Sequence, residues 1–338
     1  MGAIRRTRIA GAATHFPEHT LSSRDVERRI IVAGGGYRPR SGLIEGVSGI
    51  RSRHEAPAGW DASDLAAAAS SKLLAEVGLA ATDVDLLLFA SASQDMIEPA
   101  TSHIVAAKLG ARCPVFDVKN ACNSVLNAMQ VGEALIGSGQ YRRVLVCTGE
   151  MPSIAVRWQV ADRAQFIEAF PGYTLSDSGA AVLLEASEDE SGIYHRAFSA
   201  DSRAWNVGTL PGGGTAHPRD DEYSYFRMDG TRLKEAFFGL GRGLLDEALS
   251  ATGTTWEDYA VILVHQVTAP LLDAFVERSG IPPERLVHTL AEHGNLASST
   301  LPAQLTQAVA HGRCGPGDRI ALIGLAGGVS LGIMLATL

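Results

Sequence analysis

The chain has 338 residues, 46% of them hydrophobic and 20% charged, and its net charge is −8 at pH 7. This composition excludes an intrinsically disordered protein, which needs low hydrophobicity and high net charge, and it disfavours nucleic-acid binding, which usually needs a basic face. No apolar run reaches the roughly 18 residues of a membrane span, and the N-terminus has no signal-peptide core, so we expect a cytoplasmic protein without a membrane span.

The first half of the chain alternates segments typical of strands and of helices. The predicted strands cover residues 7–17, 84–93, 114–118, 142–150 and 178–186. The predicted helices cover residues 63–79, with Ser63 as the N-cap and Gly78 near the end, 101–110, which Gly110 terminates, and 123–139. The apolar run at 84–93 is of the kind found in strands that are buried on both faces.

The second half repeats this order. Its predicted strands cover residues 191–200, 259–266 and, as two strands joined by Ala-Gly-Gly, 318–338. Its predicted helices cover residues 230–253, 269–280 and 299–312. Residues 201–227 read as a long irregular insertion, and loops of that length often cover functional sites.

Alternating strands and helices indicate an α/β protein. Each half contains a strand, a helix, further strands and two closing strands, which is consistent with an internal structural duplication although no literal repeat is visible. We therefore divide the chain into two similar halves, residues 1–186 and 187–338.

The four cysteines show neither metal-ligand spacing nor a disulfide framework, so we expect free thiols and no metal site. Cys122 stands between a predicted strand and a predicted helix. A thiol at a helix N-terminus faces unpaired N–H groups and the positive end of the helix dipole, which favour the reactive thiolate. The alternative is a small buried hydrophobic residue, as Cys113 and Cys147 are in similar apolar contexts.

Two further polar residues stand at the ends of apolar segments. His265 follows the apolar run 261–264, and an imidazole there can deprotonate a thiol or donate to an oxyanion, or else cap the local backbone. Asn295 follows His293 and Gly294; its amide can donate to an oxyanion, but Gly-Asn is also a common turn pair, and His293 is an alternative actor.

Gly327 and Gly328 lie between the last two predicted strands. Two glycines allow the backbone to approach a ligand closely, and their N–H groups can point at a substrate carbonyl. The alternative is a simple tight turn. The pair is not a phosphate-binding loop, because the Gly-Lys-Ser/Thr sequence and the following helix are missing.

Taken together, six segments in this order resemble the thiolase superfamily, most closely its ketoacyl-acyl-carrier-protein synthase III type. The segments are SGIRSRH (48–54), NAC (120–122), LSDSGAAVLL (175–184), HQ (265–266), HGN (293–295) and AGGVSLG (326–332). The resemblance implies a five-layered αβαβα fold of two similar halves, a homodimer, and an enzyme that uses coenzyme A or carrier-protein thioesters as substrates and needs no cofactor.

The resemblance also implies roles for single residues. Cys122 would take the acyl group from a thioester, and His265 and Asn295 would bind the carbonyl oxygen of a second thioester. The N–H groups of Cys122 and Gly328 would hold the oxyanion, and the segments that contain Arg51 and Gly327 would bind substrate. Two neutral donors aimed at an enolate oxygen lower its energy, and the acyl-cysteine separates loading from condensation.

The chain departs from the housekeeping members of this family at two places. The tryptophan that stacks on the coenzyme A adenine in those enzymes has its counterpart here around Leu43. The helix after the catalytic histidine, which carries basic residues for docking an acidic carrier protein, here contains Pro270, Asp273, Glu277 and only one basic residue, Arg278. This composition disfavours carrier-protein docking on that helix.

Glu98 and Pro99, together with DVKNAC (117–122), resemble the enzymes that join two acyl chains head to head without decarboxylation. In those enzymes a glutamate from the partner subunit acts at the acyl site. A malonyl thioester forms its carbanion by losing carbon dioxide, whereas a plain acyl thioester must lose an α-proton to a base. The alternative for Glu98 is a solvated loop carboxylate.

Three hypotheses follow. The first is decarboxylating condensation with a malonyl-type thioester, which gives a β-ketoacyl product in fatty-acid or polyketide assembly. The second is head-to-head condensation of two acyl thioesters with Glu98 of the partner as base. The third is an acyltransferase that forms an ester or amide on the same fold. Small residues at Ala92, Ala100 and Ala128 indicate room for an acyl chain of undetermined length.

Overall fold

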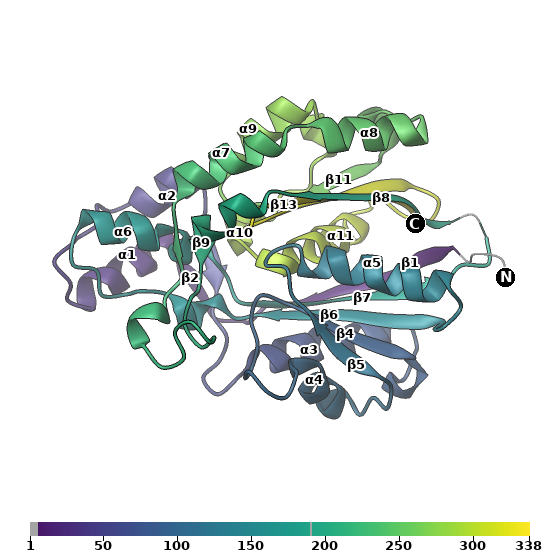
Figure 1. Ribbon diagram of the computed structural model, residues 1–338, viewed down its shortest axis with the longest axis horizontal. Coiled ribbons are helices and arrows are strands. Elements are labelled where there is room, and N and C mark those ends of the chain that lie inside the picture. Colours follow the sequence, from purple (N-terminus) through teal and green to yellow (C-terminus); the bar gives the residue numbers. More distant parts are fainter. Residues whose placement is uncertain (1–5, 190) are drawn as a thin grey trace.

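The computed structural model describes residues 6–189 and 191–338, and their helices and sheets form five layers (Figure 1). Two helices cover the outer face of the first sheet, two lie between the sheets, and three cover the outer face of the second sheet. In that order they are α3 (Ala62–Glu76) and α4 (Thr101–Leu109), α5 (Ser124–Gly137) and α11 (Thr300–Ala310), and α7 (Gly230–Leu240), α8 (Gly243–Thr252) and α9 (Ala269–Ser279). The expected αβαβα class is confirmed.

The two sheets share one pattern of strand pairing. The first has the order β1-β7-β6-β4-β5, and the second has the order β8-β13-β12-β11. In each, the first three strands pair antiparallel and the next pair is parallel. The strands are β1 (Thr7–His15), β4 (Leu86–Ala90), β5 (Val115–Val118), β6 (Arg143–Glu150), β7 (Ser178–Ala186), β8 (Gly192–Ala200), β11 (Val261–Val264), β12 (Arg319–Ala326) and β13 (Ser330–Thr337). The division of the chain after residue 186, between β7 and β8, stays a prediction.

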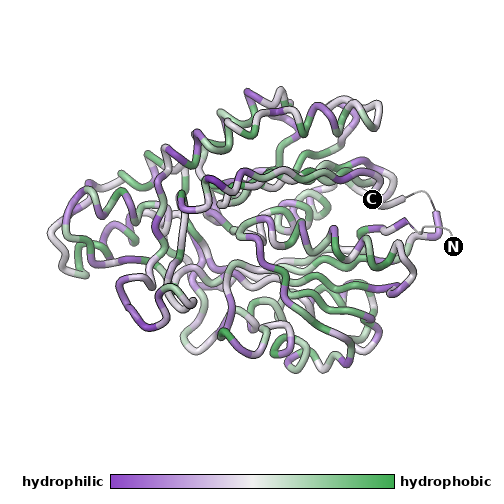
Figure 2. The backbone as a smooth tube through the Cα atoms, in the orientation of Figure 1, coloured by the Kyte–Doolittle hydropathy of each residue, from purple (hydrophilic) through white to green (hydrophobic). Residues whose placement is uncertain are grey.

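Alternation of side chains along the strands builds a separate core on each face of a sheet. In β6, Val144 and Val146 pack into the core around α5 and α11, whereas Leu145 and Cys147 pack into the core under α3. Because successive side chains point to opposite faces, a strand covered on both sides is apolar throughout. Figure 2 shows this as a hydrophobic interior of strands and central helices.

The structure corrects two expected features of the helices. The N-cap of α3 is Asp61 rather than Ser63; the Asp61 N–H donates to Asp64 Oδ2 at 2.8 Å, while Ser63 is buried in the first turn. The single helix expected at 230–253 is two helices, α7 and α8. They separate at Gly241, whose φ of 70° and ψ of −175° no helix can continue.

A side lobe that the sequence patterns did not predict packs against this body. It has its own small core, which includes Ile44, Val160, Phe166 and Tyr173. Its elements are α1 (Ser23–Val32), α2 (Leu43–Ser48) and α6 (Arg163–Ala169). The remaining short elements are β2 (Thr20–Ser22), β3 (Ser52–His54), β9 (Gly208–Thr209), β10 (Arg227–Met228) and α10 (Leu290–His293). In the described ranges, no helix is long and apolar enough to cross a membrane.

Glycines let α3 lie directly on the first sheet. A Cβ added at Gly179 would stand 2.0 Å from the Leu65 carbonyl oxygen, and one added at Gly149 would stand 1.8 Å from that of Ala62. Neither neighbour is a flexible side-chain end, so the helix itself would have to move.

We therefore predict that Gly179→Ala lowers the free energy of unfolding by about 3 kcal/mol, at the upper end of overpacking costs. The control is Gly46→Ala on α2, where an added Cβ meets nothing within 4 Å; it should stabilise by roughly 0.5–1 kcal/mol because alanine has the higher helix propensity. Denaturant unfolding of both variants measures the difference. Equal stability of the two variants would contradict this account of the α3 contact.

Candidate active site

Cys122 lies between the end of β5 and the start of α5, and it is partly exposed. The next residue, Asn123, is fully buried and anchors this junction. Its Nδ2 donates to Ser330 Oγ at 2.9 Å and to the Ser330 carbonyl at 3.3 Å. A Cβ added at Gly324 would stand 2.0 Å from Asn123 Oδ1, so β12 needs a glycine there. The N-terminus of α5 is thereby fixed to β12 and β13.

His265 directly follows β11, and its ring is buried. Its Nδ1 lies 3.1 Å from Thr300 Oγ1, and the Thr300 hydroxyl donates to the Ala297 carbonyl at 2.9 Å. Because the hydroxyl hydrogen is used there, we assign the ring hydrogen to Nδ1. Among the described residues nothing pairs with His265 Nε2, which is buried and left for a ligand. Burial lowers the pKa of His265 to about 4, so the ring is neutral at pH 7.

Asn295 is buried in the loop that precedes α11. Its backbone N–H donates to the Thr174 carbonyl at 2.8 Å, and its carbonyl accepts from the Ser176 N–H at 3.0 Å. Its side-chain Oδ1 accepts from the Ala297 N–H at 3.0 Å. This contact fixes the orientation of the amide and leaves Nδ2 as the end that can donate to a bound oxygen.

Residues 295–300, which include Asn295, contact both the segment before Cys122 and the His265 ring. Ser298 Oγ donates to the Ala121 carbonyl at 2.8 Å, directly before Cys122, while Thr300 contacts His265. Ala121 and Ala297 have φ angles of 45° and 48°, in the left-handed region that costs energy for alanine. Such residues persist only where surrounding contacts hold them, and they cluster at functional sites.

The surroundings of Cys122 oppose the effect expected from the helix N-terminus. Burial of the sulfur, followed by the negative charge of Glu150, raises the pKa of the Cys122 thiol to about 12. The expectation of a resting thiolate is therefore wrong, and the thiol carries its proton at pH 7. A base must accept that proton, and the neutral His265 ring with a free Nε2 is suited to do so.

The turn between β12 and β13 borders open space. A Cβ added at Gly327 or Gly328 would meet nothing within 4 Å, and Gly328 has a φ of 127°. The turn is held from outside the strands, because the Val329 N–H donates to the Asp201 carbonyl at 3.1 Å and the Asp201 N–H donates back at 2.9 Å. The oxyanion role of the turn stays a prediction.

The structure does not place the other two candidates in this network. Arg51 is exposed, forms an ion pair with Glu292, and lines a separate cavity of about 480 Å³ that also includes His293. Glu98 is exposed at the tip of the loop between β4 and α4. In the parts of the chain that the structure describes, no group of three or more His, Cys, Asp or Glu could hold a metal ion.

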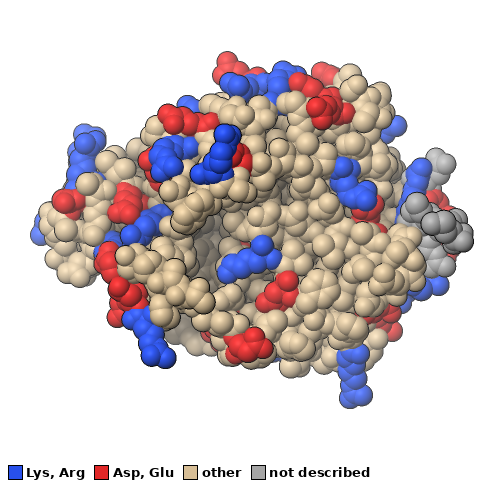
Figure 3. Space-filling view, in the orientation of Figure 1, with Lys and Arg blue, Asp and Glu red and all other residues tan. Residues whose placement is uncertain are grey.

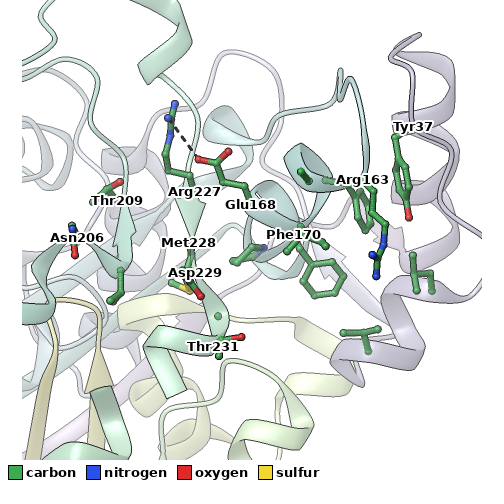
Figure 4. A pocket seen from close by; sticks show the side chains of 18 of the residues that line it. Tyr37, Arg163, Glu168, Phe170, Asn206, Thr209, Arg227, Met228, Asp229 and Thr231 are labelled. Carbon is green, nitrogen blue, oxygen red and sulfur yellow. Dashed lines mark ion pairs between the residues drawn. The ribbon is translucent and has the colours of Figure 1, made fainter. Parts of the chain in front are cut away.

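A cavity of about 840 Å³ lies between the side lobe and residues 206–231 (Figure 4). Arg40, Arg163 and Arg227 line it together with Tyr37 and Phe170. Arg227 is 3.7 Å from the Glu168 carboxylate, whereas Arg40 and Arg163 make no ion pair with a described residue. Leu43, which stands near the counterpart of the adenine-stacking tryptophan of the housekeeping enzymes, lines the same cavity. Tyr37 therefore supplies an aromatic ring close to the place where the sequence lacks that tryptophan. Cys122, His265 and Asn295 are not among the lining residues.

Sequence reasoning missed Glu150, Ser298, Thr300 and the aromatic residues of this cavity. A signal for Glu150 was present, because this residue ends the apolar strand β6 just as His265 follows β11. Ser298 and Thr300 offered none, since hydroxyl residues before a helix are ordinary caps.

The chain matches known proteins over nearly its whole length. A family model described as 3-oxoacyl-[acyl-carrier-protein (ACP)] synthase III matches residues 116–202, and the model of the C terminal of that synthase matches residues 249–338. Proteins named beta-ketoacyl-[acyl-carrier-protein] synthase III from Methylococcus capsulatus and Rhodospirillum rubrum are each 31% identical to it; the matches cover 98% of this chain and 98% and 99% of theirs.

A solved structure of Xanthomonas campestris OleA with bound lauric acid and lauroyl-CoA is also similar. It aligns with a TM-score of 0.89 at 25% sequence identity and covers 99% of this chain and 100% of that one. The two family models contain the positions of Cys122, His265 and Asn295.

The raised pKa of Cys122 predicts how the thiol reacts. Its alkylation by iodoacetamide should be slow near pH 7 and should accelerate by about tenfold per pH unit up to about pH 10, because only the thiolate reacts. The modification rate of Cys122, followed by peptide mass spectrometry, measures this, and Cys122→Ala gives the background from the other cysteines. A rate that levels off below about pH 8 would contradict the geometry, since it would mean a stabilised thiolate.

Proposed function

Because the chain belongs to the 3-oxoacyl-[acyl-carrier-protein] synthase III family, we propose that it accepts an acyl group on Cys122 and condenses it with a second thioester to give a β-ketoacyl product. One observation carries this proposal. Residues 295–300 contain Asn295, contact the residue before Cys122 through Ser298 and contact the His265 ring through Thr300, while His265 Nε2 is buried without a described partner.

In the loading step the Cys122 proton passes to His265 Nε2 while the sulfur attacks the thioester carbonyl. The N–H groups of Cys122 and Gly328 hold the oxyanion, and the thioester sulfur then leaves with the proton from His265. The acyl-cysteine remains, and no proton is gained or lost overall. Such a covalent intermediate divides one difficult reaction into two easier steps.

In the condensation step the enolate oxygen of the second thioester accepts hydrogen bonds from Asn295 Nδ2 and from His265 Nε2. For His265 to donate there, its ring hydrogen must move from Nδ1 to Nε2. Rotation of the Thr300 hydroxyl from the Ala297 carbonyl to Nδ1 supports that tautomer, because Oγ1 lies within reach of both. The enolate carbon attacks the acyl carbonyl, and the Cys122 sulfur leaves as a thiolate, which takes up one proton from solvent, or the α-proton removed by a base, to restore the thiol. A malonyl-type thioester forms this enolate by losing carbon dioxide.

The position of Glu98 favours a second candidate, head-to-head condensation of two acyl thioesters. Glu98 stands at an exposed tip beside Met96 and Ile97, which are 49% and 70% exposed. The end of this loop at α4 contacts Asp117 on β5, an edge strand whose Phe116 is 40% exposed. We propose that a second copy of the chain covers this surface, as in a homodimer, and that Glu98 enters the partner's site and removes the α-proton.

The cavity that contains Arg40 and Arg163 supports a coenzyme A thioester as the acyl donor. Unpaired arginines suit phosphate groups, and Tyr37 and Phe170 offer aromatic faces to an adenine (Figure 4). OleA, a similar protein, was solved with lauroyl-CoA.

On the face shown in Figure 3, acidic and basic side chains are interspersed around a hollow, which suits a small substrate better than nucleic acid. We place the reaction in the cytoplasm.

The proposal predicts a mass increase of one acyl group on Cys122 after incubation with acyl-coenzyme A, absent in Cys122→Ala. Adding malonyl-coenzyme A should then release carbon dioxide and β-ketoacyl product if the second step is decarboxylating. Product from acyl-coenzyme A alone, lost in Glu98→Gln but not in the neighbouring Gln94→Ala, would instead establish head-to-head condensation. Transfer of the acyl group to an alcohol or amine would indicate the acyltransferase hypothesis, and an adduct that survives Cys122→Ala would refute the assignment of the nucleophile.

The donor cavity predicts a separable effect on binding. Arg163→Ala should raise the KM for acyl-coenzyme A by about tenfold, as expected for one lost charged contact, with little change in kcat. Arg242→Ala is the matched control, because Arg242, the N-cap residue of α8, is exposed and pairs with Asp246. Steady-state loading kinetics measure both. An unchanged KM in Arg163→Ala would remove this cavity from the donor site.

A further inference from the structure

Glu150, the last residue of β6, is only 1% exposed and lies beside the nucleophile. Its Oε1 accepts from the Ala92 N–H at 3.0 Å and from the Ser298 N–H at 3.3 Å. Its Oε2 lies 3.4 Å from Ser93 Oγ. A buried carboxyl group needs such donors, because a carboxylate that is removed from water without hydrogen-bond partners destabilises the folded chain.

These donors belong to two different functional segments. Ala92 and Ser93 begin the loop whose tip carries Glu98. Ser298 belongs to the segment that holds Asn295, and its own Oγ donates to the Ala121 carbonyl at 2.8 Å. One carboxyl group thus joins the base of the Glu98 loop to the Asn295 segment, and Ser298 extends the connection to the residue before Cys122.

Glu150 also acts on the thiol through its charge. Glu150 on β6 is the charged group that acts on the Cys122 thiol, whereas neither His265 after β11 nor Lys119 after β5 affects its pKa. His265 is neutral at pH 7, and Lys119 is exposed and donates to Gln94 Oε1 at 3.3 Å. The Glu150 charge raises the pKa of the Cys122 thiol, while burial raises the pKa of Glu150 itself.

Glu150 is poorly suited to remove a proton from substrate. Oε1 already accepts two backbone hydrogen bonds, and Oε2 faces a serine hydroxyl of the same chain. A catalytic base needs a lone pair directed at the proton that it abstracts. The contacts of Glu150 are those of a group that holds other segments in place.

We propose that Glu150 is a positioning residue whose carboxyl group holds the Glu98 loop and the Asn295 segment against the Cys122 junction. This inference rests on the proposed role of Cys122 as the nucleophile. It assigns Ser298 as the link through which the position of Glu150 reaches Cys122.

Two substitutions separate the two effects. Glu150→Gln keeps the shape and an accepting oxygen but removes the charge, so the pH profile of Cys122 alkylation by iodoacetamide should shift to lower pH, and acyl loading should slow by about tenfold or more. Ser298→Ala keeps the Glu150 carboxyl group and its two backbone donors, and it removes a hydroxyl that contacts the Ala121 carbonyl and also lowers the pKa of Glu150. It should slow acyl loading without moving the alkylation profile. If Glu150 had a role in folding alone, its substitution would not move the pH midpoint of Cys122 alkylation in the folded variant.

Asp177→Asn is the matched control for loss of a buried carboxyl group. Asp177 is fully buried and accepts from the Ala56 N–H at 2.8 Å and the Ser153 N–H at 3.0 Å, but its charge does not act on Cys122. Its alkylation profile should match that of the unsubstituted chain. Thermal melting of each variant shows which ones fold. If Glu150→Gln does not fold, Ser298→Ala still tests the connection between Glu150 and Cys122.

The outcomes distinguish this inference from the proposed function. If the unsubstituted chain forms no acyl adduct, the proposed function fails, while the alkylation profiles still test the effect of Glu150 on the thiol. If the adduct forms, either of two results overturns the inference. One is an alkylation profile of Glu150→Gln that superposes on that of the unsubstituted chain. The other is acyl loading of Ser298→Ala at the normal rate. A shifted profile in Glu150→Gln alone, with slow loading in both variants, supports it.

Discussion

The central helical layer is the constraint on which the site depends. α5 and α11 lie between two sheets, so each must be apolar on most of its circumference, and both contribute to the core shared by the sheets. Gly132 on α5 allows that approach, because a Cβ there would lie 2.9 Å from a Leu184 methyl group. Helices held this closely have little freedom to slide or rotate. Their N-termini are therefore fixed relative to each other, and the loops that lead into them carry Cys122 and Asn295.

Burial at these N-termini decides the chemistry that the side chains can perform. The same desolvation that raises the pKa of Cys122 to about 12 lowers that of His265 to about 4, so both groups are neutral before substrate binds. An ion pair formed here without substrate would be costly in such dry surroundings. Under the proposed function, charge would be stabilised where an oxyanion meets directed donors, so the thiol would stay inactive until a thioester carbonyl is in place. The field of the helix N-terminus is too weak to reverse this.

Sequence patterns predicted the layers and the three central residues for a physical reason. Strands buried on both faces read as apolar runs, and a polar residue that ends such a run, like His265, is conspicuous. The same reasoning applied to Glu150 but was not used, because a glutamate before a loop also suits a solvated position. The side lobe was missed because α2 and α6 span only six and seven residues, too few for a periodic pattern to stand out. The break at Gly241 and the cap at Asp61 depend on single dihedral angles and contacts that a periodic pattern does not contain. The placement of Ser298 and Thr300 requires the sheets to be assembled first.

The loop between β4 and α4 connects an exposed apolar tip to the surroundings of Cys122. Its base is held by Glu150 at one end and by Asp117 at the other, where the carboxylate accepts from the Thr101 and Ser102 N–H groups at 3.0 and 2.9 Å. Its tip, which includes Met96 and Ile97, is exposed and apolar, an arrangement that a second protein surface would stabilise. The base of the loop and the Asn295 segment share the Glu150 carboxyl group. A second copy of the chain on this tip, as we propose, would therefore act on the contacts that hold the Cys122 junction, and the donors that surround Glu150 offset the cost of burying an ionisable group there.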